Sequence, residues 1–238
     1  MSGNTLIFIL LILLFVFIAF FKRKLTPAAT LTALGIGILV YAGTGLPGIL
    51  LLNTFFIISI TATSWCKDKK SEFPFYNVHE KRNAWQVLAN GGVAAFLASL
   101  PLLYPSFNDL SLLLLACSLS SATADTISSE LGILYGKNFY NIISFKKDQK
   151  GEDGVISLEG TIAGIIGSLV ISLIYAGSKA EFDFAILVIV LAGTLGNMFD
   201  SFLGALLERK HIINNDVVNF LNTAFAALIG WILSELIL

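Results

Sequence analysis

Apolar residues along the chain gather in long runs that short polar segments separate. Each run approaches the roughly 20 apolar residues that a helix needs to cross a bilayer. We therefore predict an all-α fold, a polytopic integral membrane helical bundle of about eight transmembrane helices. The predicted spans are Asn4–Phe21, Pro27–Gly43, Pro47–Ser64, Ala84–Tyr104, Leu110–Tyr135, Ile156–Ala176, Phe184–Leu207 and Val217–Leu238.

The first run resembles a signal peptide in its length, but it lacks the basic segment that precedes the apolar part of such a peptide. The basic stretch "FKRK" follows it instead, so we predict a transmembrane span. No soluble domain separates the runs. We predict one membrane domain over residues 1–238, with peripheral scaffold helices in 1–64 and catalytic helices and loops in 82–238.

Positive charge is distributed on one side of this arrangement. All basic residues except Lys179 fall in the loops after the first, third, fifth and seventh spans. Basic residues are retained in cytoplasmic loops. This pattern predicts that those four loops are cytoplasmic, that both termini are non-cytoplasmic, and that the protein is multi-pass with its active site on the cytoplasmic side.

Composition agrees with a membrane protein and excludes several other classes. The chain has 56% hydrophobic and 13% charged residues and a mean hydropathy of +0.83, whereas soluble domains carry about 25% charged residues. Two cysteines and two histidines are too few for a disulfide framework or a zinc site with the usual ligand spacing. No nucleic-acid partner is expected.

Polar residues within the spans concentrate at the predicted cytoplasmic ends. Ionisable side chains inside a membrane usually face the bundle interior or an aqueous cavity. Interhelical hydrogen bonding is the alternative explanation for the amides of the fourth span, and an ion pair with a basic residue is the alternative for Asp125. We favour one cavity open to the cytoplasm. Its candidate residues are Arg82, Asn83, Gln86 and Asn90; Asp125, Thr126, Ser129 and Glu130; Ser157, Glu159, Gly160 and Thr161; Asn197, Asp200 and Ser201; and Asp216, Asn219 and Asn222.

The oxygen-rich chemistry of this cavity suits Mg²⁺, which binds one or two carboxylates together with substrate phosphates. We predict Asp125, Asp200 and Asp216 as metal ligands, and Asp125, Asp200, Glu130 and Lys137 as catalytic. Lys137, Lys146 and Lys147 would neutralise a triphosphate, although topology alone also explains lysines in these loops. Asn83, Gln86 and Asn90 would orient the acceptor phosphate or a ribose. The stretch "GILYGKN" is one residue too short for a Walker loop and ends in Asn.

Several ordered blocks resemble a known family. They are "KRNAWQVLANGG", "ATADTISSELG", "GVISLEGTIAG", "GTLGNMFDSFLGALLE" and "NNDVVNFLNT". Together they are similar to the membrane protein family that contains transmembrane protein nineteen and plant phytyl-phosphate kinase. The succession of Asp-Thr, Gly-x-x-x-Gly-Lys and "SLEGT" also resembles dolichol kinase and its polyprenol kinase relatives, which are CTP-dependent.

This resemblance implies a polytopic kinase that phosphorylates a lipid-soluble isoprenoid monophosphate, with Mg²⁺ and with CTP or another nucleoside triphosphate as donor. By position it assigns Asp125, Thr126, Ser129, Glu130 and Gly132 to the acidic motif; Ser157, Glu159, Gly160 and Thr161 to the S-x-E-G-T element; Asn197, Asp200 and Ser201 to a second acidic motif; and Asn219 and Asn222 to the last block.

One turn departs from the family pattern. Members often carry a "GTNGG"-like turn where this chain has "GEDGV". Glu152 and Asp153 there argue against direct phosphate binding, and either metal binding or solvation explains them. Two other functions remain open at this point. One is a cytidylyltransferase that acts on a lipid phosphate, and the other is a cation- or proton-coupled membrane transporter.

Overall fold

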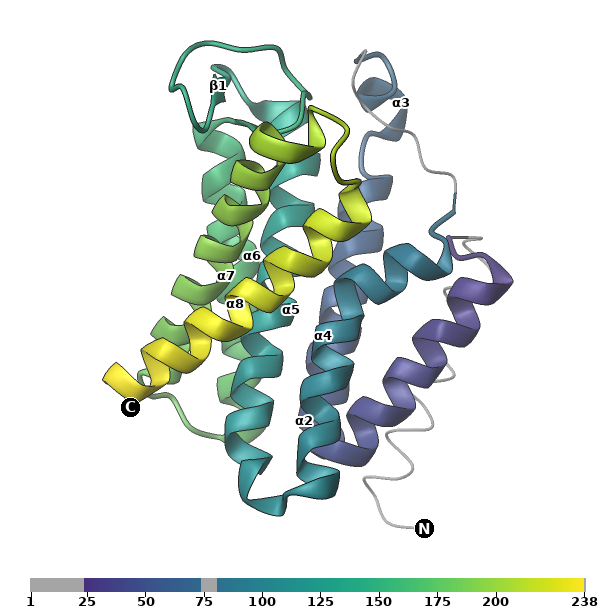
Figure 1. Cartoon of the computed structure of the whole chain (residues 1–238), viewed down its shortest axis with the longest axis vertical. Helices are drawn as coiled ribbons and strands as arrows, with labels where there is room; N and C mark the ends of the chain where they lie inside the picture. Colours follow the sequence, from purple (N-terminus) through teal and green to yellow (C-terminus); the bar gives the residue numbers. More distant parts are fainter. Residues whose placement is uncertain (1–23, 74–80, 238) are drawn as a thin grey trace.

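The computed structural model describes residues 24–73 and 81–237 as a bundle of long helices (Figure 1). Within these residues, six helices are long and apolar enough to cross a membrane. The predicted first span, Asn4–Phe21, lies outside the described residues. The long helices are α2 (Pro27–Ser64), α4 (Ala84–Leu103), α5 (Asn108–Tyr135), α6 (Leu158–Lys179), α7 (Ala185–Leu203) and α8 (Asn215–Ile237).

Short elements complete the fold. The 3₁₀ turn η1 (Pro105–Phe107) leads into α5, and the π-helical turn η2 (Gly204–Glu208) extends α7. The four-residue α3 (Lys67–Lys70) follows α2. Strands β1 (Tyr140–Asn141) and β2 (Val155–Ile156) pair antiparallel, with Tyr140 opposite Ile156. The all-α prediction therefore holds except for this two-stranded pair.

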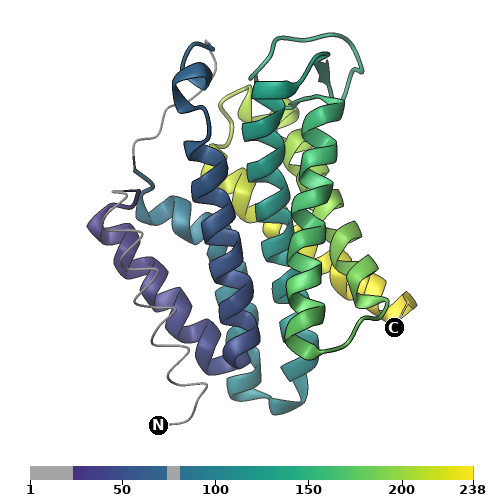
Figure 2. The same ribbon diagram turned by 180° about the vertical axis from the view of Figure 1, so that it is seen from behind.

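Helix α2 is a hairpin of two arms. Gly45 interrupts its 38 residues with φ +66° and ψ −151°, a conformation that a residue with a side chain rarely adopts. Pro47 follows and removes one helical hydrogen bond. Figures 1 and 2 show the chain folding back at this point. The arms occupy the predicted spans Pro27–Gly43 and Pro47–Ser64, so the described residues confirm a polytopic helical bundle, while the total of eight spans stays a prediction.

Local capping explains where α2 and α4 begin. The Thr26 hydroxyl accepts a hydrogen bond from Ala29 N (3.2 Å), and Pro27 occupies the first turn of α2. Asn83 and Gln86 form a reciprocal capping box at the start of α4. Such caps depend on residues three positions apart, and the predicted and observed helix starts agree within a few residues.

Helix α5 lies at the centre of the bundle. Its most apolar stretch is 78% buried, against 39–44% for the other long helices. Small residues let its neighbours approach closely. A Cβ on Gly193 of α7 would lie 2.1 Å from Ser120 Oγ, and one on Gly230 of α8 would lie 2.5 Å from Cys117 Sγ. The central helix therefore packs closely against α7 and α8.

The two ends of the bundle differ in charge. The segment that contains β1, together with α3, lies at one end, and the C-terminus of α8 lies toward the other (Figure 1). Lysines of α3 and of the loop after α5 thus share one end. Lys179, at the C-terminal end of α6, bonds Asp109 at the start of α5 (Nζ to Oδ1, 3.1 Å). This arrangement agrees with the one-sided charge pattern of the sequence.

Candidate active site

A cavity of about 360 Å³ opens at the end of the bundle near β1. Its walls come from the C-terminal half of α5, the start of α6, the end of α7 with η2, and the loop between β1 and β2. Among the described residues that line it, every ionisable side chain is acidic. These side chains are Asp125, Glu130, Glu152, Asp153, Asp200 and Glu208.

Asp125 of α5 and Asp200 of α7 both line this cavity and lie next to each other. Their carboxyl groups lie within hydrogen-bonding reach. Asn222 of α8 donates from Nδ2 to Asp200 Oδ1 (2.6 Å) and accepts from the Ser121 hydroxyl at its own Oδ1 (3.1 Å). Three helices thus determine where the Asp200 carboxylate points. The ion pair with a basic residue that was the alternative for Asp125 does not form among the described residues.

A second hydrogen-bonded contact joins α5 to α7 beside the aspartate pair. Ser128 Oγ lies 3.0 Å from both Asn197 Oδ1 and the carbonyl oxygen of Asp125. Gly164 of α6 lies against the same amide, and a Cβ there would be 2.8 Å from Asn197 Nδ2. Asn197 is therefore held by neighbours on two helices at the cavity wall.

The start of α6 forms the facing wall. Ser157 caps the helix, its hydroxyl accepting from Gly160 N at 3.1 Å. Gly160 packs so tightly on α5 that a Cβ would lie 2.8 Å from Ser128 O. Thr161 also lines the cavity, whereas Glu159 does not and accepts instead from the backbone N–H of Lys137 (3.3 Å). Part of the "SLEGT" block is thus explained by capping and helix packing.

The turn over the cavity is tied to the end of α7 by Arg209. Its Nη1 donates to Asp148 Oδ2 (2.8 Å), and its Nη2 pairs with Glu152. The hydrogen bond from Arg209 lowers the pKa of the Asp148 carboxyl, and burial raises the pKa of Asp153. Glu152 is therefore ion-paired, so solvation alone does not account for it.

Glycines let this turn approach α7. Gly154 has φ +74°, and a Cβ on it would lie 2.3 Å from Ala205 Cβ. A side chain at this position would therefore push the turn away from η2, which carries Glu208.

Glu130 of α5 takes part in a buried ion pair that links the end of α2 to the centre of the bundle. Lys70 of α3 is fully buried, pairs with Glu130, and donates to the carbonyl oxygens of Ala62 and Thr63, both at 3.0 Å. Sequence reasoning missed Lys70 because it occurs among exposed basic residues. Glu130 lines the cavity, but its contacts are those of a positioning residue.

Several predicted residues do not line the cavity. Asn83 and Gln86 are engaged in the capping box, and Asn90 donates to Gln86 O within α4 (3.0 Å). Thr126 bonds Ala122 O in its own helix (2.9 Å), whereas Ser129 and Ser201 do line the cavity. The prediction that one cavity gathers all the polar blocks is therefore too broad. The predicted residues absent from its lining are Arg82, Asn83, Gln86, Asn90, Thr126, Lys137, Lys146, Lys147, Glu159, Asp216, Asn219 and Asn222.

The predicted phosphate-binding lysines stand outside the cavity as well. Lys137, Lys146 and Lys147 are exposed to solvent, and none of them lines the cavity. Glu208, by contrast, was not predicted as a site residue but belongs to the cavity wall. It ends η2, and the sequence offered only its place in the block "GTLGNMFDSFLGALLE" as a signal.

The donor set fits a hard cation that shares its ligands with a substrate. No group of three or more His, Cys, Asp or Glu side chains able to hold a metal occurs in the described part of the chain. The pair Asp125 and Asp200 supplies two carboxylates next to amide oxygens, and Mg²⁺ commonly binds one or two carboxylates and completes its shell with water and phosphate oxygens. Asp216 does not join this pair at the cavity wall.

Membrane-length helices around an acidic cavity at one end define the class of this molecule as a polytopic integral membrane protein. Residues 10–227 match the family described as "Integral membrane protein DUF92". The chain belongs to this family, and the match agrees with the resemblance found in the sequence blocks.

Relatives occur in archaea, plants and cyanobacteria. The chain is 36% identical over 190 residues to the uncharacterized membrane protein MJ0933 of Methanocaldococcus jannaschii, covering 78% of this chain and 76% of that protein. It is 31% identical over 226 residues to the chloroplastic protein VTE6 of Arabidopsis thaliana, covering 90% of this chain and 66% of VTE6. A Synechocystis membrane protein, sll0875, is 29% identical over 215 residues, which is 88% of this chain and 82% of that protein. No solved structure matches the chain.

Proposed function

We propose that this protein is a membrane kinase that transfers the γ-phosphoryl group of CTP or another nucleoside triphosphate to an isoprenoid monophosphate, giving the diphosphate. The observation that carries the proposal is the pair Asp125 and Asp200, which face each other in a cavity at one end of the membrane helices. The family resemblance of the blocks that contain both residues supports the same reaction.

Charge in the cavity favours a metal-dependent reaction. A nucleoside triphosphate is strongly anionic, yet no basic side chain lines the cavity in the described part of the chain. Asp125 and Asp200 would hold Mg²⁺, with Asn222 orienting Asp200. When bound, the metal supplies neutralisation of the phosphate oxygens, which is the main catalytic requirement of phosphoryl transfer.

The acceptor needs little activation. A phosphomonoester is mostly dianionic near neutral pH, since its second pKa is about 6. One of its oxygens attacks the γ-phosphorus, the bond from that phosphorus to the β–γ bridging oxygen breaks, and the nucleoside diphosphate leaves with the electron pair. No proton has to be removed from the attacking oxygen, which is consistent with a cavity lined by carboxylates and without histidine among its described lining residues.

The test uses purified full-length protein in nanodiscs with Mg²⁺, CTP or ATP, and phytyl, geranylgeranyl or farnesyl phosphate. We expect a prenyl diphosphate and a nucleoside diphosphate as products. Asp125→Asn and Asp200→Asn should each lower kcat by about 100-fold or more, as removal of one preorganised electrostatic group does elsewhere. Asp109→Asn is the matched control on α5, because this aspartate is exposed at the opposite end.

The products also separate this reaction from its alternatives. Release of pyrophosphate with a nucleotidyl-lipid product would identify a cytidylyltransferase. Ion flux across proteoliposomes with no consumption of prenyl phosphate would identify a transporter. Wild-type turnover by both Asp→Asn variants would show that the chemistry lies elsewhere in the molecule.

A further inference from the structure

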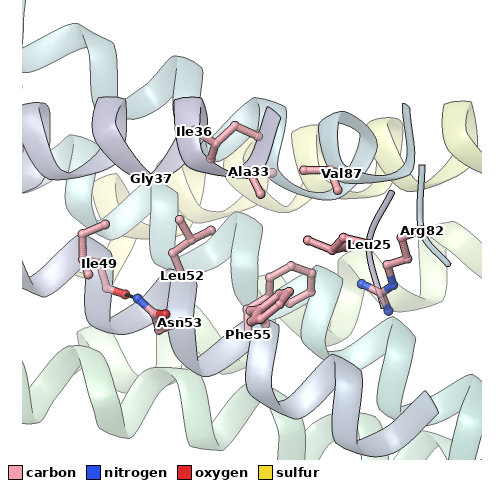
Figure 3. Close-up of a pocket in the computed structure, with 12 residues that line it drawn as sticks. Leu25, Ala33, Ile36, Gly37, Ile49, Leu52, Asn53, Phe55, Arg82 and Val87 are labelled. Carbon is pink, nitrogen blue, oxygen red and sulfur yellow. Dashed lines mark hydrogen bonds between the residues drawn. The ribbon is translucent and has the colours of Figure 1, made fainter. Parts of the chain in front are cut away.

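A second, apolar cavity lies between the two arms of α2 and the start of α4 (Figure 3). Its volume is about 60 Å³. A water occupies about 10–15 Å³ on this scale, so the cavity has space for about five water-sized groups. Figure 3 shows Arg82 and Leu25 at one end and Ile49 and Asn53 at the other. Arg82 and Asn53 are the polar residues among the described lining, and the others are apolar residues or glycines.

Backbone pairing holds Arg82 at its end of the cavity. Leu25 and Arg82 form a parallel bridge in which Thr26 N donates to Arg82 O (3.0 Å) and Arg82 N donates to Lys24 O (2.8 Å). The segments that begin α2 and α4 are thus joined. The position of the Arg82 Cα is therefore set by main-chain hydrogen bonds that do not depend on what its side chain binds.

Arg82 lines the apolar cavity but not the acidic one, and two carboxylates of the acidic cavity influence its guanidinium group through their charge. Burial lowers the pKa of Arg82, and the charges of Glu130 and Asp125 raise it, so both carboxylates of the acidic cavity act on it. Arginine keeps its charge in proteins. Within the described residues, no side chain forms an ion pair with this guanidinium. A cation partly withdrawn from water is costly unless an anion balances it.

We propose that this cavity binds the first isoprene unit of the acceptor, with the acceptor phosphate at Arg82 and directed toward Asp125. The inference deepens the proposed kinase function and rests on it. A five-carbon branched unit matches space for about five water-sized groups, and a planar guanidinium suits phosphate oxygens. A glycerophospholipid would have to place its glycerol and two acyl chains where the cavity offers space for one short apolar segment.

Filling the cavity tests the apolar part of this proposal. Ala33→Phe adds a ring where Ala33 lines the cavity, and Ala28→Phe is the matched control on the exposed face of the same arm. We expect Ala33→Phe to raise KM for geranylgeranyl phosphate about tenfold or more, with the KM for the nucleotide and kcat little changed. Equal KM values for both variants and the wild type would overturn the assignment.

Arg82→Gln tests the phosphate contact, and Arg82→Lys retains the charge. Binding is measured directly with a diazirine-bearing prenyl phosphate and with the corresponding prenyl alcohol. We expect Arg82→Gln to weaken phosphate binding about 10- to 100-fold, the value of a charge-assisted contact, and to leave alcohol binding nearly unchanged. Arg82→Lys should recover part of the loss, and crosslinks should map to the cavity residues Leu25, Ala33 or Leu52.

Because this binding assay requires no turnover, it separates the two proposals. Crosslinking at the cavity without phosphoryl transfer by the wild type would contradict the proposed kinase function and support the proposed binding site. Turnover with crosslinks that map elsewhere would contradict the proposed binding site and support the proposed kinase function. Displacement of the probe by phosphatidate as effectively as by unlabelled prenyl phosphate would show that the occupant is a phospholipid and overturn the inference.

Discussion

At the scale of single residues, the cavity depends on side chains that orient the two aspartates. Asn222 is fully buried and joins Ser121 of α5 to Asp200 of α7. Ser128 and Asn197 make the corresponding contact beside Asp125. A buried amide that satisfies both partners positions a carboxylate at little cost, whereas its removal leaves two polar groups unpaired.

We therefore predict that Asn222→Ala lowers kcat about 10-fold or more and weakens the apparent affinity for Mg²⁺, because Asp200 loses the donor that orients it. Steady-state kinetics across a Mg²⁺ titration measures both effects. Ser172→Ala is the control, since this buried hydroxyl bonds Leu169 O in its own helix. A loss of thermal stability with unchanged Mg²⁺ dependence would show that Asn222 acts on the fold alone.

At the scale of elements, one ion pair holds the second arm of α2 against α5. The Lys70 ammonium satisfies two carbonyl groups near the end of this arm and also pairs with Glu130. Cations are favoured near helix C-termini, where carbonyl groups lack partners. The buried pair thus sets the position of α2 relative to the cavity wall that carries Glu130.

Breaking this pair should destabilise the protein strongly. Lys70→Met removes one partner of the buried Lys70–Glu130 ion pair, and we expect a loss of about 3 kcal/mol, typical for a buried ion pair that loses one partner. Lys70→Met combined with Glu130→Gln should recover part of it, because no buried charge remains. Thermal unfolding in detergent measures all three proteins, and equal losses for the single and double variants would contradict the assignment.

At the scale of the whole molecule, polarity runs from one end of the bundle to the other. The acidic cavity, α3 and the lysine-bearing loop share one end, and the contact between Lys179 and Asp109 marks the opposite end. From the retention of basic residues on the cytoplasmic side, we predict that the cavity faces the compartment that contains nucleotides.

This orientation predicts the accessibility of engineered thiols. In a background with exposed Cys66 replaced by Ser, a cysteine at exposed Ser144 should react with an impermeant maleimide only after the cells are permeabilised. A cysteine at exposed Glu181, at the other end, should react in intact cells. Buried Cys117 should react in neither case. The opposite labelling pattern would place the cavity outside.

The sequence by itself determined the membrane class, the helix ranges and the end at which the polar blocks gather. These properties follow from the transfer free energy of single spans of about 20 residues, from capping residues and from the distribution of charge among the loops, and none of them requires contacts between helices. Asp125 and Asp200 could be paired as candidates because both occur near the same predicted membrane face.

Tertiary structure alone decided which of the candidates meet. The rotation of each helix about its axis is set by close contacts such as Gly193 against Ser120, which no single helix encodes. Those contacts turn Asp125 toward Asp200 and bring Glu208 to the same cavity. They leave Asn83 and Gln86 to cap α4, because a hydrogen-bonding side chain has the same sequence pattern whether its partner is a substrate or its own backbone.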